Sequence, residues 1–192
     1  MSTQIFNAAI AAYEDSINDL RNMTNMVASI MRNQGKSYEP RITLNQFDIL
    51  LQYSMLQIAL ADGYLDESEA LFIKDIAQYS DFCVFLNQHG FNNVTWQTIY
   101  NTRESTLNSL LDEAKADIME LSEDFITVFS LVDAATDYNF VDDLKRNVLV
   151  IVLATCQADG HADAIELNNG CLIVSAINEI ERRKKAFESL KN

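Results

Sequence analysis

The chain has 192 residues, enough to bury a sizeable core, and its 28 acidic against 14 basic residues give a formal net charge of −14. This charge repels phosphate backbones and anionic lipid head groups, so nucleic acid and membrane surfaces are not expected partners. With one proline and five glycines the chain has few helix breakers, which predicts an all-α protein. Its three cysteines form no CxxC pair and fit a reducing compartment, which predicts a cytoplasmic location.

The N-terminal segment is predicted to form one helix over residues 3–33. Its apolar positions alternate steps of four and three, the spacing of a helix that packs along its whole length. This stripe consists of Phe6, Ile10, Tyr13, Ile17, Leu20, Thr24, Val27 and Met31. We expect it to pack within its own domain; an intermolecular coiled coil is the alternative. Because the net charge opposes close association, a monomer or weak dimer is expected.

Breaker and capping residues divide the next part of the chain. Gly35 can end the first helix and Pro40 disfavours a helical conformation in the residue before it, so residues 34–40 are predicted to be a linker. The second helix is expected to begin near Thr43, a suitable N-cap. Beyond it we expect a third helix over residues 67–79. An irregular segment follows over residues 81–96, with a short helix at 84–87 inside it.

After residue 102, four helices are predicted, over residues 103–121, 123–135, 141–157 and 164–190. Ser122 is expected to cap the second of them, and Gly170 to be a close-packing point inside the last. The run 148–153 is rich in β-branched residues and alone would also suit a buried strand. It is far shorter than the about 20 residues that a membrane-spanning helix needs. The basic run 182–185 should complement the negative end of the helix dipole.

A ten-residue pattern occurs twice, 97 residues apart, and it favours a helix over a strand at 148–153. Five of the ten positions are identical between residues 61–70 and 158–167, and each copy stands between two helical patterns. We therefore predict a single all-helical domain over residues 1–192, built from two pseudo-repeated helix-turn-helix units and an extra N-terminal helix. The N-terminal helix is expected in residues 1–34. The first half of the repeat spans residues 43–101, and the second half spans residues 102–192.

Each copy places three carboxylates around an Asp-Gly turn, and the six residues are Asp62, Asp66, Glu69, Asp159, Asp163 and Glu166. One interpretation is structural, since Asp66 and Glu69, like their counterparts in the second copy, stand at the N-cap and N3 positions of a capping box. The other is a binding site for Ca²⁺ or Mg²⁺, because the carboxylates are hard oxygen ligands folded back by a glycine. An EF-hand is excluded, because Ile58 and Leu60 stand where its first ligands belong. The residues alone favour neither interpretation.

With these two turns the chain resembles the tellurite-resistance TerB-like family over roughly residues 44–180. The resemblance rests on Asp62, Gly63, Asp66 and Glu69 and, in the second turn, on Asp159, Gly160, Asp163 and Glu166. It implies an all-helical module, linked to the stress response, whose acidic surface binds divalent cations. It also implies protein partners, because related domains are attached to J-domain co-chaperones. The first helix, the segment 91–96 and the long final helix are not matched.

The sequence lacks the usual catalytic patterns. Its two histidines, His89 and His161, belong to neither an HExxH nor an ExxH pattern, and it has no phosphate-binding glycine loop and no nucleophile elbow. We therefore expect a non-enzymatic protein. The alternative to a cation-binding module is a helical adaptor whose acidic turns only cap helices and bind no metal. A thermal stability that depends on divalent cations would distinguish the two.

Overall fold

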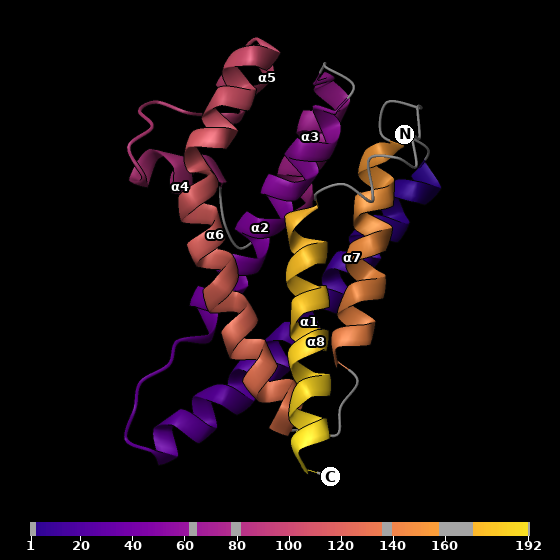
Figure 1. The fold of residues 1–192 in the computed structure, drawn as a ribbon. Helices are drawn as coiled ribbons and strands as arrows, with labels where there is room; N and C mark the ends of the chain where they lie inside the picture. The colour runs from indigo at the N-terminus through magenta and orange to yellow at the C-terminus, as the bar shows by residue number, and fades with distance from the viewer. Residues whose placement is uncertain (1–2, 62–64, 78–81, 136–139, 158–170, 192) are drawn as a thin grey trace.

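The computed structural model describes residues 3–61, 65–77, 82–135, 140–157 and 171–191, and the regular structure in these ranges is entirely helical. The helices are α1 (Thr3–Asn33), α2 (Pro40–Ala59), α3 (Glu67–Ile76), α4 (Phe82–Gln88), α5 (Trp96–Asn101), α6 (Glu104–Ala135), α7 (Phe140–Cys156) and α8 (Leu172–Lys191) (Figure 1). The all-α class predicted from the sequence is confirmed. The run 148–153, which alone would also suit a strand, lies within α7.

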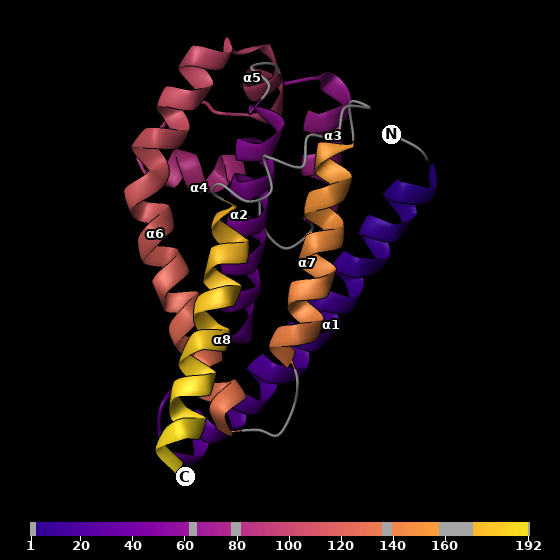
Figure 2. The ribbon, with the colours of Figure 1, turned by 45° about the vertical axis from the view of Figure 1, so that its right-hand side comes forward.

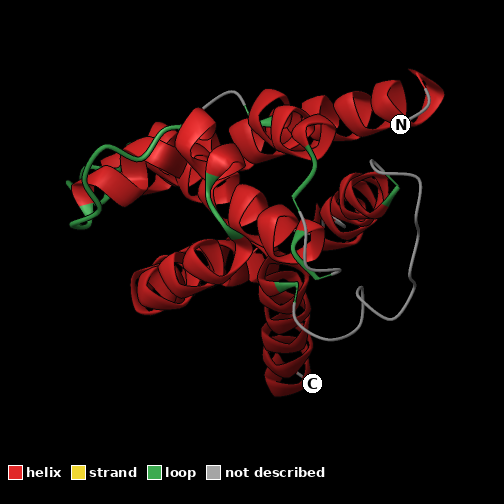
Figure 3. Cartoon of the chain, turned by 90° about the horizontal axis from the view of Figure 1, so that it is seen from above, coloured by secondary structure: helices red, strands yellow, loops and turns green. Residues whose placement is uncertain are grey.

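Helix α2 lies in the middle of the bundle and is buried on almost every side. Of its 20 residues, 14 are buried, and it contacts α1, α3, α4, α6, α7 and α8. The long helices α1, α6, α7 and α8 stand around it (Figures 2 and 3). Among them, α1 packs mainly against α7, and α6 against α8. Such a position suits a helix whose apolar residues are not confined to one face, and α2 buries polar side chains such as Gln52 and Ser54 as well.

One buried cluster joins the two halves predicted from the repeat. Leu51 and Met55 of α2 and Val148 and Val152 of α7 are each 0% exposed. These four residues belong to a hydrophobic cluster to which every described helix contributes. The two helices that precede the acidic turns therefore share a core.

Aromatic rings run through this cluster from α2 across α6 to α7. The ring centroids of Phe47 and Phe125 lie 6.2 Å apart, those of Phe125 and Phe129 4.7 Å, and those of Phe129 and Phe140 5.2 Å. These separations fall within the about 4.5–7 Å range of favourable aromatic pairs. The series ties the three helices together through large, fully buried side chains.

Helix α1 has the bounds predicted from its sequence, and its apolar stripe packs inside the molecule. The stripe is buried from Tyr13 to Thr24, and α1 contacts α7, α2 and α3. Gly35 follows the helix with a φ of +70°, a conformation that glycine adopts readily. The Lys36 N–H donates to the Met31 carbonyl at 2.9 Å, the long bond of a Schellman C-terminus.

Helix α2 begins at Pro40, so the expected start near Thr43 is wrong. Proline suits the first position of a helix, because the N–H that it lacks would have no partner there. Glu39 before it is extended, with φ −108° and ψ 108°, as a residue preceding proline should be. Thr43 is buried one turn into the helix, and its hydroxyl lies 2.7 Å from the Tyr38 hydroxyl.

The break expected at Ser122 does not occur, because α6 runs without interruption from Glu104 to Ala135. Ser122 is 3% exposed and faces the core, as do Ile118 and Phe125 on the same side of the helix. This spacing of four and three residues continues the buried face through the serine. Packing along the whole helix therefore overrides a local capping signal.

Two other helix ends differ from the sequence prediction. Helix α3 stops at Ile76 instead of residue 79, because Ala77 is extended, with φ −95° and ψ 114°. Helix α8 begins at Leu172, and Cys171 before it is not helical. The prediction of an unbroken helix from Ala164 is therefore wrong. Ala164 itself and the predicted packing position at Gly170 lie outside the described residues. The short helix expected at 84–87 is confirmed as α4.

Buried polar side chains of α2 hold the ends of three other helices. The Gln52 amide nitrogen donates to the Ile73 carbonyl near the end of α3 at 3.3 Å, and its oxygen accepts from the Phe82 N–H at the start of α4 at 3.2 Å. The Ser54 hydroxyl accepts from the Ile173 N–H at the start of α8 at 3.0 Å. Because helix ends leave backbone groups without intrahelical partners, these bonds fix where α3, α4 and α8 meet α2.

Candidate functional site

The first acidic turn leads into a complete capping box at the start of α3. Asp66 is the N-cap, with φ −72° and ψ 151°, and its side chain accepts from the Ser68 N–H at 2.7 Å. In return, Oε2 of Glu69 accepts from the Asp66 N–H at 2.9 Å. Hydrogen bonds from the Ser68 hydroxyl and backbone lower the pKa of Asp66 below its ordinary value. The structural role predicted for Asp66 and Glu69 is therefore present.

The remaining predicted carboxylates cannot be placed. Asp62, Asp159, Asp163 and Glu166 lie outside the described residues. In the described part of the chain, no group of three or more histidine, cysteine, aspartate or glutamate side chains is arranged to hold a metal ion. Binding of Ca²⁺ or Mg²⁺ at either turn stays a prediction.

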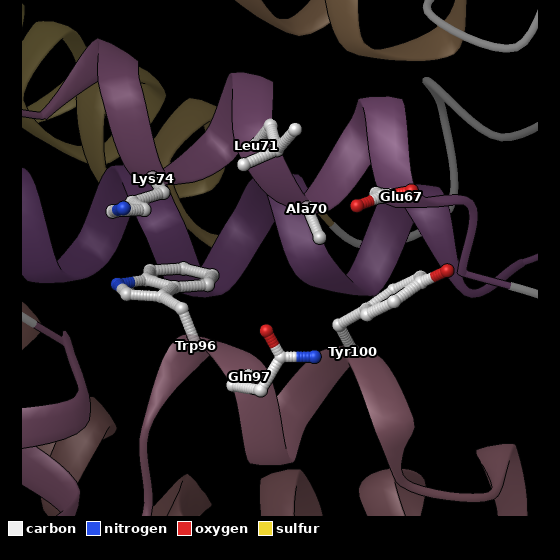
Figure 4. A pocket seen from close by; sticks show the side chains of 7 residues that line it. All are labelled: Glu67, Ala70, Leu71, Lys74, Trp96, Gln97 and Tyr100. Atoms are coloured by element: carbon white, nitrogen blue, oxygen red, sulfur yellow. The ribbon is translucent and has the colours of Figure 1, made fainter.

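A groove opens directly beside this capping box, between α3 and α5 (Figure 4). It encloses about 180 Å³, and its lining residues are Glu67, Ala70, Leu71, Lys74, Trp96, Gln97 and Tyr100. The first four come from α3 and the last three from α5, so two helices form opposite walls. Leu71 is 49% exposed at this groove, and Trp96 and Tyr100 are half-buried.

Local capping interactions set the wall that α5 forms. Thr95 is the N-cap of α5, its hydroxyl accepts from the Thr98 N–H at 3.1 Å, and the Thr98 hydroxyl accepts from the Thr95 N–H at 2.6 Å. Ile99 is 2% exposed and anchors α5 to the core. Trp96 and Tyr100, on other positions of the same short helix, line the groove.

The connection before α5 is also held by side-chain bonds. Asn87 at the end of α4 donates from its amide nitrogen to the Val94 carbonyl and accepts from the Val94 N–H, both at 2.9 Å. These two bonds close the segment between α4 and α5. The α5 wall is thus fixed at both its start and its buried face.

Charges of opposite sign stand at the two ends of the groove. Glu67 lies at the Tyr100 end and Lys74 at the Trp96 end (Figure 4). Seven residues of helix separate the two charges, which corresponds to about 10 Å along the axis of α3. Leu71 lies between them. The groove therefore combines apolar contact area with a defined electrostatic direction.

Sequence analysis missed this groove because it did not predict α5. The segment 81–96 contains breakers, and the six residues of α5 are too few for a clear apolar period. The spacing of Thr95 and Thr98 around Trp96 was the available signal, because it matches the spacing of an N-cap and its N3 partner.

A second hollow has a larger volume, but its lining offers fewer kinds of side chain for recognition. It encloses about 500 Å³ between the start of α2 and the middle of α6, and its lining residues are Ser37, Tyr38, Glu39, Ile42, Thr43, Gln46, Asp124, Thr127 and Val128. It offers one aromatic ring and charges of one sign only. The α3–α5 groove joins two aromatic rings with charges of both signs, and we therefore take it as the candidate site.

In the described part of the chain, His89 and three residues of the basic run, Arg182, Arg183 and Lys185, pair within the molecule. In the basic run, Arg182 lies 2.6 Å from Glu179, Arg183 contacts both Glu179 and Glu123, and Lys185 bonds Glu181. Of the two histidines, His89 places Nδ1 3.2 Å from Asp117, and its ring is tilted against that of Phe85 with centroids 4.3 Å apart. His161 lies outside the described residues.

Comparisons with known proteins add no assignment. No family model, no curated protein and no solved structure matches the chain. None of the helices in the described ranges has both the length and the apolar composition required to cross a membrane.

Proposed function

We propose that this protein is a non-enzymatic helical binding module that recognises a segment of another protein in the groove between α3 and α5. The observation that carries the proposal is that the exposed Leu71 of α3 lines the same groove as two aromatic side chains of α5, Trp96 and Tyr100. Tryptophan and tyrosine are enriched among the few residues that supply most of the binding energy at protein interfaces. The groove volume of about 180 Å³ is below the about 300–1,000 Å³ of small-molecule pockets, which favours a protein side chain as the occupant.

The rigidity of the walls supports the same proposal. Both helices begin at a capping box, at Asp66 for α3 and Thr95 for α5. Ile73 and Ile99 anchor them to the core at 0% and 2% exposure. A groove that is formed before binding loses little conformational entropy when it is occupied, which favours affinity.

The test compares two exposed apolar residues that differ in their surroundings. Leu71 in the groove and Met119 on α6 are both 49% exposed. We expect a partner captured from the source cell to bind the native protein and Met119→Gln equally, and to bind Leu71→Gln at least about tenfold more weakly, the effect of losing an interface anchor. Equal binding by Leu71→Gln and the native protein would remove the groove as the recognition site.

Divalent-cation binding at the first acidic turn is a second candidate function, in keeping with the TerB-like resemblance. What supports it is the charge of the turn, since the lowered pKa keeps Asp66 anionic and Glu67 next to it is exposed. A stress-linked role belongs to this proposal through the resemblance alone. The duplicated Asp-Gly turns in the sequence are its basis.

The cation proposal predicts that millimolar Ca²⁺ or Mg²⁺ raises the melting temperature. A ligand at 100 times its dissociation constant stabilises a protein by about 2.7 kcal/mol. Asp62→Asn should weaken this response more than Asp159→Asn, because Ala164 replaces a carboxylate of the first turn in the second copy. Identical melting curves with Ca²⁺, Mg²⁺ and chelator would reject cation binding and leave the adaptor proposal standing.

A further inference from the structure

We infer that the α3–α5 groove accepts a basic side chain of its partner, a lysine or arginine whose alkyl chain lies on Leu71 between the rings of Trp96 and Tyr100 and whose charge meets Glu67. This inference rests on the proposed function and adds the chemistry of the partner to it. It is carried by the shape of the groove, by its aromatic walls and by the charges at its ends.

The size of the groove fits one extended side chain. Its volume of about 180 Å³ is below the about 300–1,000 Å³ of small-molecule pockets, which suits a single side chain. Ala70 and Leu71 offer an apolar wall on the α3 side. The alkyl stem of lysine or arginine packs on such a surface while its charged end stays in contact with water.

The aromatic walls favour a cation. Trp96 and Tyr100 flank the groove from α5 (Figure 4), and the faces of both rings attract an ammonium or guanidinium group. The negative faces of these rings repel a carboxylate. An acidic side chain is therefore disfavoured between the rings.

The charges select the end at which the cation binds. Glu67 at the Tyr100 end is exposed and follows Asp66, whose pKa is lowered. Lys74 at the opposite end repels a basic group. The chain as a whole carries a net charge of −14, which accelerates the approach of basic segments. The partner segment should therefore be basic at the Glu67 end and neutral or acidic at the Lys74 end.

The experiment uses three synthetic peptides that differ at one position. Each is N-acetylated and C-amidated, with lysine, norleucine or glutamate between alanines, so that the alkyl chain and the charge are varied separately. The full chain contains one tryptophan, Trp96, so its fluorescence reports directly on the groove. We expect the lysine peptide to bind about fivefold more tightly than the norleucine peptide, in line with an exposed cation–aromatic and ion-pair contact, and the glutamate peptide to bind most weakly.

Variants of the full chain identify the source of this preference. Glu67→Gln keeps the shape of the side chain and removes its charge, so lysine and norleucine peptides should then bind almost equally. Glu113→Gln, an exposed residue of α6 away from the groove, should leave the preference unchanged. Salt at 1 M should reduce the lysine preference of the native protein, because it screens exposed charges.

The outcomes separate this inference from the proposed function. Equal affinity of the lysine and norleucine peptides for the native protein, with a response from Trp96, overturns the basic preference and leaves a groove that binds apolar side chains. No response of Trp96 to any of the peptides also overturns the inference. Only the additional finding that partner capture does not depend on Leu71 would reject the proposed function as well.

Discussion

At the scale of single residues, several polar side chains of this protein bind the ends of helices. Asp66 caps α3 together with Glu69, Thr95 caps α5, and Gln52 and Ser54 reach the ends of other helices from inside α2. Capping boxes were predictable from the sequence, because their partners stand three residues apart. The bond of Ser54 was not, because its partner lies 119 residues further along the chain.

Replacing Asp66 by alanine should lower the free energy of unfolding by about 0.5–2 kcal/mol, because the N–H groups at the start of α3 lose their acceptor. Urea unfolding of the native protein and the variant at neutral pH measures this difference. Glu113→Ala on the exposed face of α6 is the control and should stay within about 0.5 kcal/mol of the native protein. An Asp66→Ala variant as stable as its control would contradict the structural role of the turn.

Ser54→Ala should cost about 1–3 kcal/mol, because it leaves the N–H of Ile173 buried without its acceptor. Ser130→Ala is a matched control, since this serine is also buried and its hydroxyl only donates to the Ile126 carbonyl of its own helix at 2.6 Å. Chemical denaturation of both variants gives the comparison. If the two variants lose equal stability, the hydrogen bond between α2 and α8 stabilises the fold no more than a bond within one helix does.

At the scale of helices, sequence periodicity was reliable where a helix is long and packs on one face. The bounds of α1 agree with the prediction at both ends, because a stripe of buried residues and Gly35 define them. For α7 the β-branched run left two readings open, and the repeated turn motif chose the correct one. The run forms a helix and not a strand because α7 packs against both α1 and α8.

The predictions failed where local signals and tertiary packing disagree. Ser122 looks like an N-cap, yet the core around α6 buries it in mid-helix. Helix α5 is too short to show a period, and its position depends on bonds from Asn87 to Val94. The candidate groove needs α5 and α3 together, so it could not be inferred from either segment alone.

The charged run of α8 makes stability depend on pH in a defined direction. Hydrogen bonds from Arg182 and Arg183 lower the pKa of Glu179 from 4.5 to about 2. A carboxylate whose pKa is lower in the folded state stabilises the fold above its ordinary pKa, and the effect fades as the pH falls towards the lowered value. Glu179→Gln should therefore be destabilised relative to the native protein at pH 7.

Melting temperatures measured between pH 7 and pH 2 test this expectation. The difference between Glu179→Gln and the native protein should be constant above about pH 5.5 and shrink as the pH approaches 2. Glu120→Gln, on the exposed face of α6, should show no such trend. A difference that is independent of pH would mean that the charge of Glu179 is not the source of its effect on stability.

At the scale of the whole molecule, the shared core predicts a single unfolding transition. Trp96 reports on α5 at the margin of the structure, whereas circular dichroism reports on all helices. Because every described helix contributes to one buried cluster, both signals should change at the same urea concentration. An earlier change of Trp96 fluorescence would show that α3 and α5 form a separate cooperative unit and would contradict the one-domain prediction.

The enclosed position of α2 also has a consequence for how the protein is made. Its residues, 40–59, are synthesised before those of α6, α7 and α8, which cover α2 together with α1, α3 and α4. Until then α2 can contact, of these helices, only α1, α3 and α4, and the faces that the later helices cover stay exposed, as in the aggregation-prone intermediates of other proteins. Completion of the core must therefore wait for the C-terminal helices, and we expect the growing chain to be most prone to aggregation before they are synthesised.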